Sequence, residues 1–230
     1  MKNLLNAMLV IILCFFGCNG KTDKKSTAQP KNREIVNNDS IDIESNNSVE
    51  KNTASSDSKY VEVKTWIDDF RNFRMAIYNN DVPQLKTYFS FPFEDKGHTI
   101  IGLCAISDAD WIVRKKHFKD PQLFYEADLE KYHKKVFDER FTTAILKIKS
   151  EQLVAKHSTE TKLFGDKDLI YKLYADYNED EKTLMLNMSI GNNAKYPDGN
   201  YVSEGEHNII YHFKIMNGKK LILIRVDMAG

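Results

Sequence analysis

The spacing of apolar positions between residues 61 and 81 predicts an amphipathic helix. In the segment VEVKTWIDDFRNFRMAIYNND, six positions recur at the three- and four-residue intervals of one helical face: Val63, Trp66, Ile67, Phe70, Arg74 and Ile77. Five of these six side chains are apolar, and acidic and amide side chains occupy the opposite side. The pattern is typical of a helix that buries one face against a core.

Start and stop signals predict further short helices. Asp81 can cap a helix that carries Pro83 in its first turn and ends before the SFPF segment. Ser107 can cap a helix over SDADWIVRKKHF, and Pro121 begins another helical stretch, PQLFYEADLEKYHKKVF. Between them, the apolar run TIIGLCAI at residues 99–106 is expected to form a buried strand.

The C-terminal part of the chain predicts a four-stranded meander. Strand composition with period-two alternation marks four segments: residues 169–177, 183–190, 207–216 and 221–228. NEDEK and NGKK join the first and last pairs as hairpins, and Asn217-Gly218 is the stronger turn signal. The connection over residues 191–206 is long, as functional loops often are. Helices followed by a meander predict an α+β domain, with N-terminal helices packed on a curved antiparallel sheet.

Alternation also predicts which strand side chains share a face. The expected core or pocket faces comprise three sets: Leu169, Tyr171, Leu173, Ala175 and Tyr177; Ile209, Tyr211, Phe213 and Ile215; and Ile222, Ile224 and Val226. Side chains two residues apart on a strand point to the same side of the sheet. These stripes are therefore expected to pack against the helices.

The N-terminus predicts an export signal. Residues 4–16 form an apolar run of thirteen residues, interrupted only by Asn6 and preceded by Lys2. A membrane-spanning helix needs about 20 residues, so the run has the length of a signal-peptide core.

The junction Phe16-Gly17-Cys18, followed at once by polar sequence, resembles the lipobox of bacterial lipoproteins. The resemblance implies cleavage between Gly17 and Cys18, and acylation of Cys18 with palmitate-type chains. Two chains suffice for stable anchoring. The alternative is an ordinary signal peptide followed by a chance cysteine. By analogy with sorting rules, Asn19 points to the outer rather than the inner membrane.

Composition divides the chain into residues 1–17 as signal peptide, 18–58 as a lipidated tether and 59–230 as one globular domain. Residues 19–58 contain no aromatic side chain and are rich in Asn and Ser, so this segment is expected to be disordered. Of 33 basic and 33 acidic residues, seven of each precede residue 59. The domain is therefore neutral, which argues against a nucleic-acid partner.

The order of elements over residues 62–228, together with the segment NNDVPQLKTYFSFPF, resembles the ketosteroid-isomerase-like cone fold. A cystatin-like sheet wrapped on one helix is the nearest competing architecture. The resemblance implies a concave sheet with a pocket at its open end. Members of the fold include isomerases, dehydratases and binding modules without catalysis, so the fold alone does not give the function.

Four aromatic residues are candidate pocket liners: Tyr88, Trp111, Tyr171 and Tyr211. A cone-type isomerase would need an oxyanion donor, for which Tyr88 or Tyr171 is available, and a carboxylate base. Asp110 or Asp176 could supply the base, although Asp176 lies near a hairpin end where it is expected to be solvated. No motif forces an assignment, so the catalytic residues stay open.

Metal and cofactor chemistry is not expected. The six histidines have no paired metal-ligand spacing. Cys104 is most simply a small buried hydrophobe. RKKH at residues 114–117 is a basic cluster that is expected on a solvated helix face, with phosphate or lipid-headgroup contact as the alternative.

Together these patterns predict a lipid-anchored protein of the cell envelope. Its extracytoplasmic α+β domain is expected to bind a small apolar ligand or an envelope protein, most simply without catalysis, and could form a homodimer. The alternatives are an isomerase, dehydratase or hydrolase that uses the cone pocket, and a structural envelope module without a ligand.

Overall fold

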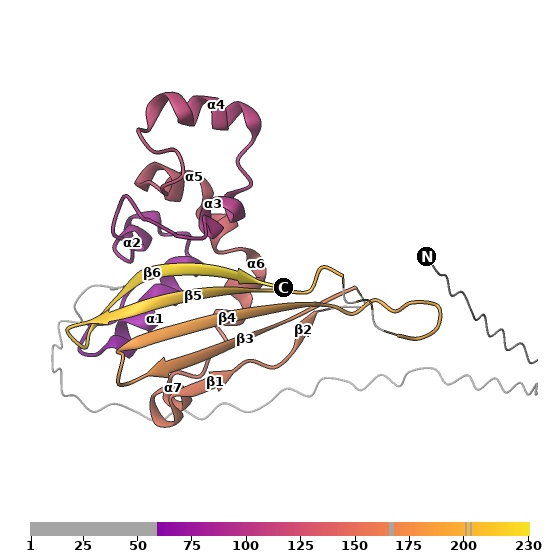
Figure 1. Cartoon of the computed structure of the whole chain (residues 1–230). Helices are drawn as coiled ribbons and strands as arrows, with labels where there is room; N and C mark the ends of the chain where they lie inside the picture. Colours follow the sequence, from indigo (N-terminus) through magenta and orange to yellow (C-terminus); the bar gives the residue numbers. More distant parts are fainter. Residues whose placement is uncertain (1–58, 166–167, 201, 203) are drawn as a thin grey trace, which may run out of the picture. The chain divides into compact units, whose positions relative to one another are not determined.

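The computed structural model describes residues 59–165, 168–200, 202 and 204–230, which form an α+β domain (Figure 1). Helices come first along the chain and an antiparallel sheet follows, as the sequence predicts. The expected signal peptide, Cys18 and the tether at residues 18–58 lie outside the described residues. The described residues belong to one compact unit, Ala54–Gly230.

Seven helices occur among the described residues: α1 Trp66–Tyr78, α2 Val82–Lys86, α3 Thr99–Cys104, α4 Asp108–His117, α5 Glu126–Val136, α6 Glu139–Ile145 and α7 Ser150–Lys156. Helix α1 confirms the first predicted helix, and its buried residues include Ile67, Phe70 and Ile77. The predicted caps are also confirmed. Asp81 accepts a hydrogen bond from the backbone of Gln84, and Ser107 accepts one from the backbone of Asp110.

The sheet is an open antiparallel one. Its strands are β1 Ser158–Glu160, β2 Phe164–Gly165, β3 Leu169–Asn178, β4 Thr183–Asn192, β5 His207–Met216 and β6 Lys220–Ala229. The spatial order is β1-β3-β4-β5-β6, and β2 also pairs with β3. The four long strands confirm the predicted meander, and helices α1, α3, α6 and α7 contact the sheet.

The prediction of a buried strand at residues 99–106 is wrong, because most of this run forms helix α3. His98 and Ala105, at either end, adopt left-handed backbone conformations with φ of 53° and 45°. The Asp95 carboxylate accepts a hydrogen bond from the Ile100 backbone over 2.9 Å. A continuous apolar run has no period of its own, so tertiary packing decides between helix and strand.

Helix α5 begins at Glu126, five residues after Pro121, where the sequence predicted its start. Phe124 forms an isolated β-bridge with Phe93, with reciprocal backbone hydrogen bonds of 2.8 and 3.0 Å. Helical geometry starts only at Glu126, where Asp128 accepts a hydrogen bond from the Tyr125 backbone over 2.7 Å.

The prediction that Ile222, Ile224 and Val226 share the core-facing side of the last strand is wrong as well. Leu221, Leu223 and Val226 are the buried residues of β6, whereas the side chain of Ile224 is 46% exposed. The register shifts by one residue, because His212 pairs with Arg225 while the next residue of β5, Phe213, pairs with Leu223. Ile224 is the extra residue of a β-bulge, which reverses the alternation beyond it. The faces predicted for the first and third strands are confirmed.

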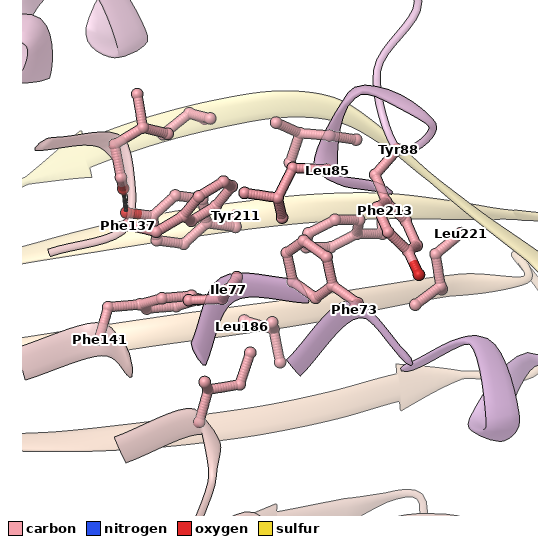
Figure 2. Close-up of a cluster of buried hydrophobic side chains, with 14 of the residues drawn as sticks. Phe73, Ile77, Leu85, Tyr88, Phe137, Phe141, Leu186, Tyr211, Phe213 and Leu221 are labelled. Carbon is pink, nitrogen blue, oxygen red and sulfur yellow. Dashed lines mark hydrogen bonds between the residues drawn. The ribbon is translucent and has the colours of Figure 1, made fainter. Parts of the chain in front are cut away.

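The hydrophobic core fills the space between the helices and the sheet (Figure 2). Phe73 of α1 lies at its centre, with its ring centroid 4.8 Å from that of Tyr88, 5.1 Å from Phe213 and 5.6 Å from Phe137. Asp69, also on α1, accepts a hydrogen bond from the Leu221 backbone over 2.8 Å and ties the helix to β6. Among the described residues, the buried core lies between Ile67 and Val226, so the unit contains a core of its own, as a domain that folds by itself does.

Candidate functional site

Tyr88 and Tyr211, two of the candidate pocket liners, lie in the core. Tyr88 is fully buried and its hydroxyl lies 3.2 Å from Asp69 Oδ1, its hydrogen-bond acceptor. The Tyr211 hydroxyl donates to the Val136 carbonyl over 2.6 Å. Burial raises the pKa of both phenols. Because the protein itself supplies both hydroxyl partners, neither side chain needs a ligand to satisfy it.

The other two candidates lie far apart in the fold, on different elements. Tyr171 is half-buried on β3, stacks on Phe164 with ring centroids 5.3 Å apart, and lines a hollow of about 530 Å³. Trp111 is half-buried on α4, where the Arg114 guanidinium carbon lies 5.9 Å from its ring centroid. The four aromatic residues therefore do not converge on one cavity.

Polar side chains instead gather on the outer face of the sheet, the side opposite the core. Asp176, Met185, His212 and Arg225 are direct neighbours in register across β3, β4, β5 and β6. With Asp227 we call them the outer-face cluster. The four register neighbours all line one hollow of about 740 Å³. His212 and Arg225 also line an adjoining hollow of about 410 Å³.

His212 is held between two charged partners of the cluster. Its Nε2 lies 2.9 Å from Asp227 Oδ2 and 3.1 Å from an Arg225 guanidinium nitrogen, and Arg225 Nε lies 2.8 Å from the same Asp227 oxygen. Depending on its tautomer, Nε2 donates to the carboxylate or accepts from the guanidinium. Burial lowers the pKa of His212, as does the positive charge of Arg225, against the opposing effect of Asp227. The lowered pKa favours the neutral imidazole.

Burial raises the pKa of Asp176. Its side chain has no hydrogen-bond or ion-pair partner among residues 59–165, 168–200, 202 and 204–230. The residue is partly exposed and lines the 740 Å³ hollow, so its carboxylate keeps part of the solvation that was expected. A charged group kept in a desolvating position without a partner is a feature of functional sites.

Replacement of Asp176 by asparagine is expected to raise the melting temperature at pH 7. The raised pKa means that folding disfavours the ionised carboxylate, so stability is lost as the pH rises through the folded-state pKa. Below the unfolded-state value of 3.8 the carboxyl is protonated in both states, and the gain should disappear. Thermal unfolding of Asp176→Asn at pH 7 and at acid pH measures the effect. The control is Asp180→Asn in the exposed β3–β4 turn, which should change little; a less stable Asp176→Asn at pH 7 would contradict the assignment.

Asp110 and Cys104 have structural roles. The Asp110 carboxylate pairs with Lys131 over 2.9 Å and accepts a hydrogen bond from the Ser107 hydroxyl, and these two contacts lower its pKa. Cys104 is fully buried, as predicted, and burial raises the pKa of its thiol to about 12. A thiol with so high a pKa is unreactive at neutral pH. The described residues contain no group of three or more His, Cys, Asp or Glu side chains placed to hold a metal ion.

Sequence reasoning missed Arg225 and Asp227. Alternation along β6 puts both residues on one face, but only the bulge at Ile224 decides that this face is the one shared with His212. A bulge leaves no clear local signal in this strand, so the pairing could not be derived from the sequence.

Comparisons of the chain with protein-family models, with curated proteins and with solved structures gave no match. Within the part of the chain that the structure describes, no helix combines the length and apolar character that a membrane span requires. Assignment to the bacterial lipoproteins and to the cone fold therefore stays a prediction.

Proposed function

We propose that this chain is a lipoprotein of the cell envelope, anchored in the outer membrane through Cys18, whose α+β domain binds a protein partner without catalysis. The observation that carries the binding role is the contrast between the two sides of the sheet. The inner side is packed with aromatic side chains, whereas the outer side is open and carries the outer-face cluster above its hollows.

A protein partner is favoured over a small apolar ligand because side chains of the protein itself fill the helix-facing side of the sheet. Tyr211, Phe213 and Phe137 pack together on the helix-facing side of the sheet (Figure 2), which is the side where the expected cone pocket would lie. On the outer face, Met185 and the half-exposed Ile224 lie next to charged groups of both signs. Apolar contacts surrounded by charged residues are the usual composition of a protein interface.

Intact-mass measurement of the full chain, extracted with detergent from a bacterial host, tests the anchor. The expected product begins at Cys18 and carries added acyl mass, which is absent from a Cys18→Ser variant. Gradient separation of the membranes then checks the outer-membrane assignment. A chain cleaved elsewhere without acyl mass would remove the lipoprotein proposal and leave the binding role of the domain to be judged separately.

Photo-crosslinking in the same host tests the binding face. A photoreactive residue in place of Met185 is expected to crosslink one partner, and Arg225→Glu should abolish the product. The matched control replaces Tyr78, which is exposed on α1 and should give no such product. A product with twice the mass of the chain would identify a homodimer. Equal crosslinking from both positions, or none from position 185, would contradict the proposal.

An enzyme is the second candidate, and the contact between His212 and Asp227 favours it. A neutral imidazole beside a carboxylate can act as a general base, and the 740 Å³ hollow has room for a small substrate. Turnover of chromogenic esters that is lost in His212→Ala and kept in Asn208→Ala, also on β5, would support this candidate. Turnover that survives His212→Ala would exclude the cluster as its site.

A further inference from the structure

Helix α4 stands apart from the rest of the domain. Figure 1 shows it at the end of the helical layer, remote from the sheet. Among its ten residues, Asp108–His117, Arg114 is the one that is buried. Because α4 buries so little of its surface, packing in the core does not explain which residues it carries.

One arginine fixes the orientation of α4. The Arg114 guanidinium donates to the Pro121 carbonyl over 2.6 Å, to the Leu123 carbonyl and to the Asp128 carboxylate of α5. Its carbon also lies 5.0 Å from the centroid of the Phe118 ring. These contacts hold one side of the helix against the turn that leads to α5, so the opposite side must face solvent.

The exposed surface of α4 carries two apolar residues. Ile112 lies on the side away from Arg114, and Val113 lies on the flank, where it lines a hollow with Arg114 and Asp128. The side chains of Ile112 and Val113 are 57% and 53% exposed. Ile112 and Lys116 are four residues apart and lie together on the side away from Arg114. An amphipathic helix normally turns its apolar residues toward the core, whereas α4 turns two β-branched residues outward.

Basic residues are in excess beside this apolar pair, where exposed Asp120 is the acidic chain neighbour of Lys119. Lys115, Lys116 and Lys119 are exposed, and none of them forms an ion pair with another described residue. The acidic Asp108 lies at the opposite end of the helix, and Asp110 is already paired with Lys131. The residues of α4 from Ile112 onward, together with Lys119 just beyond its end, therefore form a protruding patch, made of Ile112, Val113, Lys115, Lys116 and Lys119.

We propose that this patch docks on an anionic lipid surface, with Ile112 and Val113 entering the interface and the three lysines contacting headgroup phosphates. Protruding apolar residues flanked by lysines are suited to insertion between headgroups. An acidic protein is the competing occupant, but these side chains lie on a helix that stands out from the domain, whereas the outer-face cluster lines hollows into which a protein surface can fit. The contact would set the orientation of the domain on the membrane, and it does not depend on acylation of Cys18.

Sedimentation with lipid vesicles tests the proposal on residues 54–230, the compact unit that holds the whole core and lacks Cys18. The unit should bind vesicles of phosphatidylcholine and phosphatidylglycerol, should not bind phosphatidylcholine alone, and should dissociate as salt is added. Each lysine near an anionic surface contributes about fivefold to partitioning. The triple variant Lys115→Ala, Lys116→Ala, Lys119→Ala should therefore bind about a hundredfold more weakly.

A matched triple variant distinguishes the loss of the patch lysines from a loss of net positive charge elsewhere on the domain. Lys147→Ala, Lys149→Ala, Lys156→Ala removes the same charge from exposed positions outside α4 and should keep most of the binding. Ile112→Ser with Val113→Ser should weaken binding, and thermal unfolding of each variant confirms that the unit is folded. Equal loss in both triple variants, or no binding to anionic vesicles, would overturn the proposal. Binding to polyglutamate in place of vesicles would overturn it in favour of an acidic protein partner. Because Cys18 is absent from this unit, none of these outcomes bears on the anchor.

Discussion

Phe73→Ala is expected to lower the free energy of unfolding by about 3–5 kcal/mol, the usual cost of removing a fully buried phenylalanine. Phe73 has no exposed surface, and the rings of Tyr88, Phe137 and Phe213 surround it. These three rings come from segments far apart in the chain, so they cannot close over the cavity without moving the backbone that carries them. Urea unfolding followed by far-UV circular dichroism measures the change.

Tyr78→Ala is the matched control for this prediction, since Tyr78 lies on the same helix with its side chain 57% exposed. Its stability should stay within about 0.5 kcal/mol of the parent chain, as for most exposed positions. A similar loss for both variants would mean that α1 is sensitive to any truncation, and would contradict the central role of Phe73.

Arg114→Ala is expected to destabilise the domain by about 3–5 kcal/mol, because removal of one partner leaves the other charge buried. Asp128 is 5% exposed and would keep an uncompensated carboxylate, while the carbonyls of Pro121 and Leu123 would lose their donor. Helix α4 should also lose its fixed orientation. Hydrogen exchange of α4 amides, together with urea unfolding, measures both effects.

Two further variants test the cause of this loss. Lys115→Ala, at the neighbouring exposed position, should leave stability within about 0.5 kcal/mol of the parent chain. Arg114→Met combined with Asp128→Leu removes both charges and should recover most of the loss, as apolar replacements of buried ion pairs commonly do. If the double variant were as unstable as Arg114→Ala, the backbone carbonyls rather than the buried charge would account for the cost.

Helix caps and hairpin turns could be predicted from short segments of sequence, because they depend on residues that are neighbours in the chain. The caps at Asp81 and Ser107 satisfy backbone groups within three residues, and both occur as predicted. The turn at Asn217-Gly218 likewise joins β5 to β6, with both residues at positive φ. Helices α6 and α7 and the short strands β1 and β2 were not predicted, because short elements carry too few residues to establish a period.

Long-range contacts decided the candidate site. Tyr88 and Tyr211 looked like pocket liners because a buried hydroxyl needs a partner, and only the structure shows that Asp69 and Val136 provide it. The outer-face cluster depends on the register of four strands and on one bulge, and register is set by the packing of the whole sheet.

The sequence by itself determined the α+β class, the first helix, the four long strands and the burial of Cys104, since composition and periodicity record which side chains must leave water. The tertiary structure alone decided that residues 99–104 are helical, that β6 turns Ile224 outward, that the helix-facing side of the sheet is filled, and that α4 exposes Ile112 and Val113 to solvent. In each of these cases several local conformations are close in energy, and contacts with residues far along the chain select one of them.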